Sequence, residues 1–480
     1  MAKKSKIFDS ILESMGKPAE IIVPEPGQRL RLSGKKISMS LPAQTVEVEL
    51  GKERLYIRQE TGCGGSPVSD VPDLVIFNPD MDSLRFRFVF RLPAGESLHI
   101  SQDEPYLEHL FKQPREAFRR NFRLDHEGTN LVFRDTVSEY ETYVTLLDED
   151  TVSASIVDQR VDAIDKVIDA FGGPIEPLAP DAALIVLREV NALLEQEKFR
   201  QPDNSGHPGG LLNLPDKIAP VVIGDLHANV DNLLKILSEN AFMQELDAGT
   251  AAFVFLGDLV QPDREPYDEM DSSVLMMDLL FKLKLKYPDG VFFLRGNHDS
   301  FSTEVSKDLV PQAVLWRKKL EEVRGEEYRD QMANFYELCS AVVLSGEFFA
   351  CHAGPPTGKT KLDKVVNIRS HPDLLHDLMW NRIRQPGRPS GYTASDVKRF
   401  RKSLKIDKQL PFLVSHTPYT DKGALWCNVG GIENHHILYS SRPHWVSVFI
   451  SVDGKMVPQL YTAEPMLDWV NARAGTRASP

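Results

Sequence analysis

Side chains that can bind metal ions follow five apolar segments of this 480-residue chain. In the first segment, Val221–Ile223 are three β-branched residues, which indicate a buried strand, and Asp225 and His227 come just after its end. Residues two apart lie on the same side of an extended backbone, so this carboxylate and this imidazole leave the strand together. The corresponding residues after the other four segments are Asp258, Asn297 with His298, His352 and His416.

One such ending is common and usually forms a turn or a cap, but five in one region are hard to explain in that way. Aspartate, histidine and asparagine are ligands of borderline divalent or trivalent metal ions such as Mn, Fe or Zn. Cysteine is absent from the set, which argues against a structural zinc site. Three histidines and three oxygen ligands chosen from this set fit a hydrolytic site with two metal ions and one bridging carboxylate.

The elements around these residues alternate between apolar strands and helices from Ile218 onward, which is typical of an α/β fold. An apolar face at Val230, Leu233 and Leu237 predicts a helix after the first strand. The expected strands before the polar residues are 221–223, 251–256, 291–294, 348–351, in a hairpin with 341–344, and 412–414. Residues 436–439, 446–452 and 456–461 are expected to form strands of a second sheet.

The pattern of the remaining chain predicts four parts. Residues 1–157 are rich in candidate strands, for example Val46–Leu50, and a hairpin is expected between 29–32 and 37–41. Two helical stretches follow, and the Pro, Gly and Asn content of 201–213 predicts a linker or exposed loop. The expected boundaries are 1–157 for a β-rich N-terminal domain, 158–217 for a helical connector and linker, 218–465 for the catalytic domain and 466–480 for a C-terminal tail.

The composition restricts the partners. A net charge of −13 opposes binding to nucleic acid and to anionic membranes. The chain has no apolar run near the ~20 residues that a membrane helix needs, so no membrane partner is expected. The four cysteines are scattered without a CxxC pair, so no disulfide framework is expected and a cytoplasmic location is predicted.

The motifs around the polar residues, taken in order, resemble those of calcineurin-like metallophosphoesterases, and most closely the phosphoprotein phosphatase (PPP) family of serine/threonine phosphatases. They are Gly224-Asp225-Leu226-His227, Gly257-Asp258-Leu259-Val260, Leu294-Arg295-Gly296-Asn297-His298-Asp299, Cys351-His352-Ala353-Gly354 and Ser415-His416-Thr417. The resemblance covers roughly residues 218–462. Any single motif is weak, but five in the right order are specific. The resemblance implies an α/β fold in which a β-sandwich is flanked by helices, preceded here by the β-rich N-terminal domain.

The resemblance also implies the site residues. The implied ligands are Asp225, His227 and Asp258 for one metal ion and Asp258, Asn297, His352 and His416 for the other, with Asp258 bridging. A hydroxide held by both ions would attack phosphorus, and His298 would protonate the leaving alkoxide.

The chain departs from the family pattern after Gly257–Val260. The family continues with Asp-Arg-Gly, whereas here Gln261 and Pro262 intervene before Asp263 and Arg264. If this insertion is looped out, Asp263 is expected to orient His298, and Arg264 to bind phosphate together with Asn297. A second phosphate-binding arginine is expected after Trp380, with Arg388 as the first placement and Arg382 and Arg384 as alternatives.

The expected activity is hydrolysis of phosphoserine and phosphothreonine monoesters in proteins, so the expected partner is a phosphoprotein. A phosphodiesterase or dinucleoside polyphosphate hydrolase of the same superfamily is the alternative, and an inactive phosphatase fold that only binds is a second. For the N-terminal domain, substrate selection, binding of a partner and dimerisation remain open.

Overall fold

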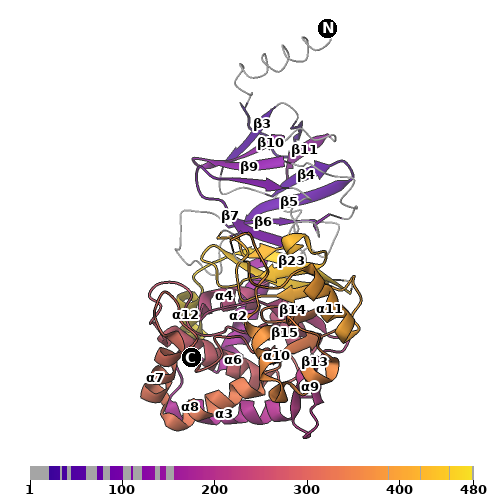
Figure 1. The fold of residues 1–480 in the computed structure, drawn as a ribbon. Helices are drawn as coiled ribbons and strands as arrows, with labels where there is room; N and C mark the ends of the chain where they lie inside the picture. Colours follow the sequence, from indigo (N-terminus) through magenta and orange to yellow (C-terminus); the bar gives the residue numbers. More distant parts are fainter. Residues whose placement is uncertain are drawn as a thin grey trace. The chain divides into compact units, whose positions relative to one another are not determined.

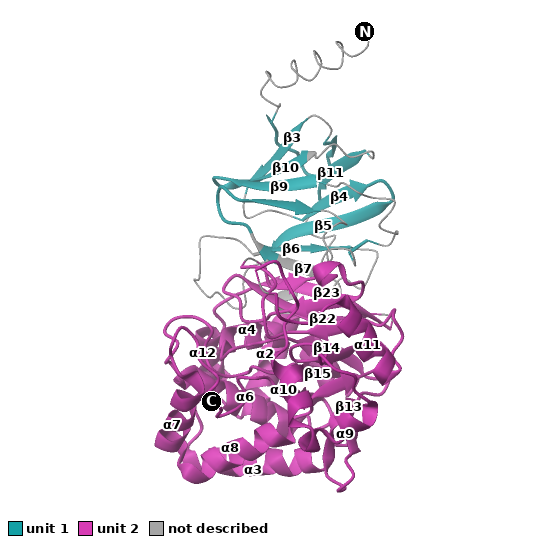
Figure 2. Ribbon diagram, in the orientation of Figure 1, with its two compact units in different colours: residues 1–157 teal, residues 158–480 magenta. Residues whose placement is uncertain are grey.

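The structure is a computed structural model, and it divides the chain into two compact units, residues 1–157 and 158–480 (Figure 2). Each unit is described by itself. The residues that the structure describes are 21–32, 35–40, 45–60, 73–78, 87–100, 110–111, 122–135, 141–147, 156–387, 389–421, 423–452 and 454–477.

The described part of the first unit consists of strands in two sheets (Figure 1). One sheet has the order β1 (Ile21–Ile22), β3 (Lys36–Ser40), β10 (Asn130–Asp135), β9 (Phe122–Glu127) and β8 (Ser97–Ile100). The other has the order β2 (Arg29–Arg31), β11 (Thr142–Leu146), β4 (Val46–Leu50), β5 (Glu53–Glu60), β6 (Asp73–Phe77) and β7 (Arg87–Arg91). Along β4, Val46, Val48 and Leu50 are buried and alternate with two less buried glutamates, as in a strand with one face on a core.

The hairpin expected between residues 29–32 and 37–41 is wrong. Strand β2 pairs with β11, and β3 pairs with β1 and β10, so the two segments belong to different sheets. The apolar pattern predicts that each segment is extended, but it does not determine which strand is the neighbour.

The second unit contains two further sheets. A seven-stranded sheet has the order β12 (Arg200–Pro202), β13 (Pro208–Asn213), β17 (Val342–Leu344), β18 (Phe349–Cys351), β19 (Phe412–Val414), β21 (His435–Leu438) and β20 (Leu425–Trp426). A five-stranded sheet has the order β16 (Val291–Phe293), β15 (Ala251–Phe255), β14 (Ala219–Ile223), β22 (Trp445–Val452) and β23 (Lys455–Thr462).

These two sheets pack face to face. Val222 and Val254 from one sheet and Ala350 and Leu413 from the other lie in a single buried apolar cluster. The neighbours of Val222 along β14 point to the opposite face, because side chains alternate along a strand, and they contact helices instead. The second unit is therefore a mixed α/β β-sandwich flanked by helices, which confirms the fold class expected from the sequence.

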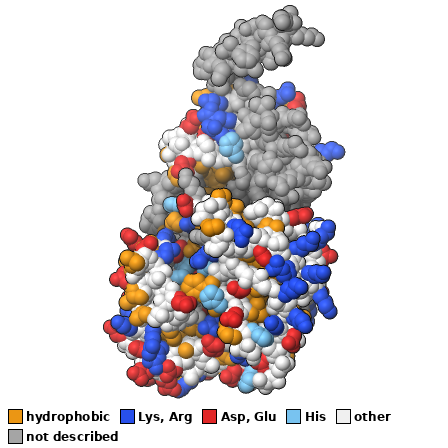
Figure 3. Space-filling model, in the orientation of Figure 1, with side chains coloured by type: hydrophobic (Ala, Val, Ile, Leu, Met, Phe, Trp, Pro, Cys, Tyr) orange, Lys and Arg blue, Asp and Glu red, His pale blue; other side chains and the backbone are white. Residues whose placement is uncertain are grey.

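Helices cover the outer faces of the sandwich. The helices are α2 (Ile156–Phe171), α3 (Pro180–Glu195), α4 (Val230–Leu237), α5 (Phe242–Asp247), α6 (Asp271–Lys286), α7 (Gln312–Arg324), α8 (Glu326–Leu338), α9 (Leu362–Val366), α10 (Pro372–Trp380), α11 (Ala394–Leu404) and α12 (Leu467–Arg477). Lys and Arg side chains gather on the side that carries α11, where Lys398 and Lys402 are exposed, so a local basic surface exists despite the negative net charge (Figure 3).

Parts of the second unit differ from the expected organisation. Helices α2 and α3 bury Ile164 and Leu187 in the same core as β14, and α12 buries Val470 there, so these segments belong to the body of the unit. Residues 201–213, expected to form a linker or exposed loop, instead hold the end of β12 and all of β13, and only the connection at 203–207 is a largely exposed turn. The strands expected to form a second sheet are divided, with β21 in the seven-stranded sheet and β22 and β23 in the five-stranded sheet, where β22 pairs with β14.

None of the helices in the described ranges is both long and apolar enough to cross a membrane.

Candidate metal centre

The predicted ligand residues converge at the ends of strands from both sheets. Asp225, Asp258 and Asn297 follow β14, β15 and β16 of the five-stranded sheet, whereas His352 and His416 follow β18 and β19 of the seven-stranded sheet. Together with His227, which follows Asp225 in the same turn, all six of these side chains are buried. Because each ligand follows a buried strand, the sandwich itself determines where the ligands meet.

Several of these residues hold an uncommon backbone conformation. His227, Asp258 and His416 have φ angles of 44°, 53° and 66°, in the left-handed region that residues other than glycine rarely adopt. Such conformations persist where the surrounding structure imposes them, and they concentrate at functional sites. Gly296 packs closely against Asp258, since a Cβ on Gly296 would come within 2.2 Å of Asp258 Oδ1.

The carboxylate of Asp258 lies between two groups of ligands. Its Oδ2 atom is 3.9 Å from His227 Nε2 on one side and 3.4 Å from His352 Nε2 on the other. His227 Nε2 is also 3.5 Å from Asp225 Oδ2. On the second side, His352 Nε2 is 3.2 Å from Asn297 Oδ1 and 3.3 Å from His416 Nδ1. This arrangement fits a bridging role for Asp258.

Backbone carbonyls orient two of the histidines. Nδ1 of His227 donates to the carbonyl oxygen of Gln261 at 2.9 Å, and Nδ1 of His352 donates to that of Leu256 at 2.8 Å. A histidine whose Nδ1 donates in this way directs the lone pair of Nε2 toward a metal ion.

The donor set fits the binding of metal ions. Among the described residues, Asp225 Oδ2, Asp258 Oδ2 and His416 Nε2 are buried and have no hydrogen-bond partner. Buried polar atoms are normally paired, so three unpaired ligand atoms in one place call for cations to satisfy them. Potential ligand atoms of Asp258, His352 and His416 lie within 4.8 Å of one another, as do those of His227, Asp258 and His298.

The electrostatics of the site favour positive charge. Burial by itself lowers the pKa of His227, but the carboxylates of Asp225, Asp263 and Asp258 outweigh it and raise that pKa to about 9. Burial likewise opposes charge on His352, whose pKa the nearby carboxylates, led by Asp258, raise to about 9. The carboxylates thus attract cations to this point.

Gln261, and not Asp263, contacts His298. Nδ1 of His298 lies 2.9 Å from Gln261 Oε1, and the amide nitrogen of Gln261 donates to the carbonyl oxygen of His298 at 3.0 Å. Asp263 instead accepts a hydrogen bond of 2.8 Å from the hydroxyl of Tyr439, and its Oδ1 atom lies 3.9 Å from Nε of Arg264. The expectation that Asp263 orients His298 is therefore corrected.

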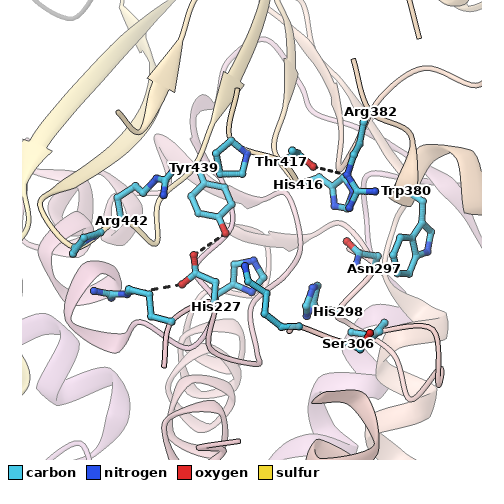
Figure 4. Close-up of a pocket in the computed structure, with 16 residues that line it drawn as sticks. His227, Asn297, His298, Ser306, Trp380, Arg382, His416, Thr417, Tyr439 and Arg442 are labelled. Carbon is cyan, nitrogen blue, oxygen red and sulfur yellow. Dashed lines mark hydrogen bonds and ion pairs between the residues drawn. The ribbon is translucent and has the colours of Figure 1, made fainter. Parts of the chain in front are cut away.

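A pocket of about 300 Å³ opens over the ligands (Figure 4). The residues that line it include four basic side chains, those of Arg264, Lys307, Arg382 and Arg442. The sequence alone did not show that the last three lie at the pocket. Nε of Arg382 donates to the hydroxyl of Thr417 at 2.9 Å. Arg388 lies outside the described residues, and of the two alternatives named for the same role, Arg382 lines the pocket whereas Arg384 is not among the lining residues.

Sequence reasoning missed Gln261 and Tyr439 as site residues. Gln261 directly follows Gly257–Val260, so it occupies the position at which the family pattern has the Asp of Asp-Arg-Gly. That position in the motif was the signal that could have identified Gln261. Tyr439 had no comparable signal, because it lies at the end of β21 and reaches the pocket only through the packing of the sheets.

Comparison with known proteins gives a consistent result. Residues 220–427 match the family model described as calcineurin-like phosphoesterase. The chain is 29% identical over 188 residues to the serine/threonine-protein phosphatase PP2A-like PPG1 of Candida albicans, which covers 36% of this chain and 39% of that protein. It is 27% identical over 175 residues to the serine/threonine-protein phosphatase 2B catalytic subunit A2 of Saccharomyces cerevisiae, covering 35% and 26%.

The matched stretch thus spans less than half the length of these relatives. A solved structure of a protein serine/threonine phosphatase from Saccharomyces cerevisiae, described as similar to human phosphatase PP5, aligns with a TM-score of 0.45 and 16% identity over 60% of this chain and 91% of that one. Residues 220–427 of this chain carry a calcineurin-like phosphoesterase domain, and the sequence relatives of that domain are serine/threonine-protein phosphatases.

Proposed function

We propose that this protein is a metal-dependent phosphatase that hydrolyses phosphoserine and phosphothreonine monoesters in proteins. The observation that carries the proposal is the convergence of six buried ligand side chains, three of which have an unpaired ligand atom among the described residues. The names of the sequence relatives support the substrate class.

In this proposal, Asp225, His227 and Asp258 hold one metal ion, and Asp258 also contributes to the second. The remaining ligands of the second ion are Asn297, His352 and His416. Mn, Fe or Zn suit these nitrogen and oxygen donors. Two such ions would supply a nucleophile from water at neutral pH and would neutralise phosphoryl oxygens.

The other pocket residues act on the substrate directly. His298 lines the pocket and would give a proton to the serine or threonine oxygen as the ester bond breaks, which matters because an alkoxide is a basic leaving group. Arg382 and Arg264 would bind the phosphate oxygens together with Asn297, since guanidinium groups pair well with phosphate. Arg388 remains a predicted phosphate ligand.

The test is a comparison of substrates with Mn²⁺ added. Phosphoserine and phosphothreonine peptides should be hydrolysed, whereas dinucleoside polyphosphates and simple phosphodiesters should be poor substrates. Hydrolysis of the dinucleotides alone would favour the alternative activity of the superfamily. If no phosphopeptide is cleaved with Mn²⁺, Fe²⁺ or Zn²⁺, the proposed substrate is wrong.

The surroundings of the enzyme are also proposed. Cys339 and Cys351 are buried free thiols, which supports a reducing compartment such as the cytoplasm. For residues 1–157, the candidate roles are selection of the phosphoprotein, binding of a partner and dimerisation. Comparing the turnover of small esters and phosphoproteins with and without this unit distinguishes the first role from the other two.

A further inference from the structure

Gln261 is a fully buried residue whose contacts join two histidines of the site. Its carbonyl oxygen accepts from Nδ1 of His227, and its side-chain amide contacts His298 at two points. Its own backbone N–H donates to the hydroxyl of Ser273 at 2.9 Å. The φ angle of 66° is in the left-handed region, and this conformation directs the carbonyl and the side chain of one residue to two different rings.

The contacts of the amide determine which ring nitrogen of His298 carries the proton. The amide NH₂ can only donate, and it faces the carbonyl oxygen of His298, which can only accept. The amide oxygen is therefore the atom opposite Nδ1, and an amide flip would place two oxygens against each other. Because Oε1 can only accept, Nδ1 must carry the hydrogen in this contact.

We propose that Gln261 is a positioning residue that fixes the ring plane and the Nδ1–H tautomer of His298, so that Nε2 is the nitrogen presented to the substrate. This inference rests on the proposed function, in which His298, protonated at both ring nitrogens, gives the Nε2 proton to the leaving oxygen and is left as the neutral Nδ1–H tautomer. The side chain of Gln261 would act only through His298, since Gln261 is not among the residues that line the pocket and only its backbone carbonyl contacts His227.

A second buried glutamine provides a matched control. The amide nitrogen of Gln312 donates to the carbonyl oxygens of Pro262 at 2.6 Å and Tyr267 at 3.0 Å, so it holds the loop that begins at Gln261. Gln312 is as fully buried as Gln261 but has no contact with His298 among the described interactions. Replacing it tests loss of loop support without loss of the contact with the ring.

The experiment compares Gln261→Met, Gln261→Glu and Gln312→Met in the full-length protein. The tautomer is measured without substrate by long-range ¹H–¹⁵N correlation on histidine-labelled, metal-free protein, with the His298 signals assigned by their loss in His298→Asn. We expect the Nδ1–H signature of His298 in the wild type and in Gln312→Met, and its loss in Gln261→Met. Gln261→Glu loses the donation to the carbonyl oxygen of His298 but keeps an acceptor for Nδ1, so it should retain the Nδ1–H signature.

The kinetic readout uses two leaving groups. For a phosphoserine peptide, kcat of Gln261→Met should fall about 100-fold with KM unchanged, because proton transfer is misdirected. For an aryl phosphate, whose leaving group departs without a proton, the fall should stay below about threefold. Gln261→Glu should recover most of the peptide turnover.

The inference is overturned if the His298 signals of Gln261→Met keep the Nδ1–H signature, or if Gln312→Met reproduces its selective loss of peptide turnover. Failure of the wild type to cleave phosphopeptides would reject the proposed function instead. The tautomer measurement would still decide the role of Gln261 in that case, because it needs no substrate.

Discussion

At the scale of single residues, Asp258 and His298 should separate metal binding from proton transfer. Asp258→Asn should abolish binding of both metal ions and turnover, because Oδ2 faces both groups of ligands. His298→Asn should keep the ions while kcat on phosphopeptides falls about 10²- to 10⁴-fold. Metal content by atomic emission and steady-state kinetics check both outcomes.

Asp231→Asn is the control for these variants. The carboxylate of Asp231 accepts backbone hydrogen bonds from Met466 and Leu467 and is not among the proposed ligands, so its replacement should leave both ions bound. Loss of metal from His298→Asn would show that this histidine is a ligand and not the proton donor.

Gly296 is expected to tolerate no side chain. A Cβ at this position would lie 2.2 Å from Asp258 Oδ1 and 2.4 Å from the backbone nitrogen of Asp258. Gly296→Ala should therefore displace Asp258 and reduce metal content and turnover together. Gly358→Ala, where a Cβ meets nothing within 4 Å, should change neither. Retention of full metal content by Gly296→Ala would contradict the tight packing of this turn.

Residue types and their order predict which side chains meet at the site, because each ligand directly follows a strand that is itself evident from its apolar residues. The partner of His298 was not predictable in this way. Spacing alone does not show whether the residues between Val260 and Asp263 loop out or point inward, and the left-handed φ angle of Gln261 decides that question.

At the scale of elements, short runs such as 412–414 and 251–256 were recognisable because they are continuously apolar and end in polar residues. Strand pairing was less predictable, since β14 lies between β15 and β22, and β22 comes from the far end of the domain. Several strands of the chain could pair with a given strand and still bury its apolar face, and which of them pairs depends on the packing of the whole sandwich.

Asp125 on β9 should make the stability of the first unit depend on pH. Its burial alone would raise its pKa, but hydrogen bonds from Arg123 on β9, Ser97 on β8 and Arg134 on β10 lower it from 3.8 to about 2. The resulting stabilisation, about 2 kcal/mol, is complete above the unfolded pKa of 3.8 and is lost as the pH falls toward 2.

Calorimetry of the full chain between pH 6 and pH 2.5 would test this prediction. Asp125→Asn should be less stable at pH 6, and the difference from the wild type should shrink toward pH 2.5. A difference that stays constant over this range would contradict the low pKa of Asp125.

At the scale of the whole molecule, amino-acid composition gave a wrong prediction where glycines allow two elements to pack closely. Residues 201–213 were expected to form a linker because they are rich in Gly, Pro and Asn. In the structure, a Cβ on Gly209 or Gly210 would lie 2.4 Å from the backbone oxygens of Val366 or Val365, so these glycines allow α9 to approach β13. Glycine content alone does not distinguish close packing from flexibility.

Two truncations should behave differently. Removal of residues 1–157 should leave a folded domain that hydrolyses aryl phosphates at close to the full rate, because the core of the second unit is internal to it. Removal of residues 1–199 also deletes α2 and α3, whose buried side chains belong to that core, and should prevent folding. Thermal unfolding and aryl phosphate turnover check both, and unfolding of the shorter truncation would contradict the independence of the second unit.

The position of β14 has a consequence for protein synthesis. In the pairing of β14 with β22, Val221 lies opposite Ile450. Asp225, two residues after the end of β14, forms an isolated β-bridge with Tyr439. A ribosome releases the N-terminal partner of each pair long before the C-terminal one. The strand that presents the first ligands can pair with β15 early, but it lacks its other neighbour, β22, until residues beyond 450 have emerged, so the nascent chain should be catalytically silent until its translation is nearly complete.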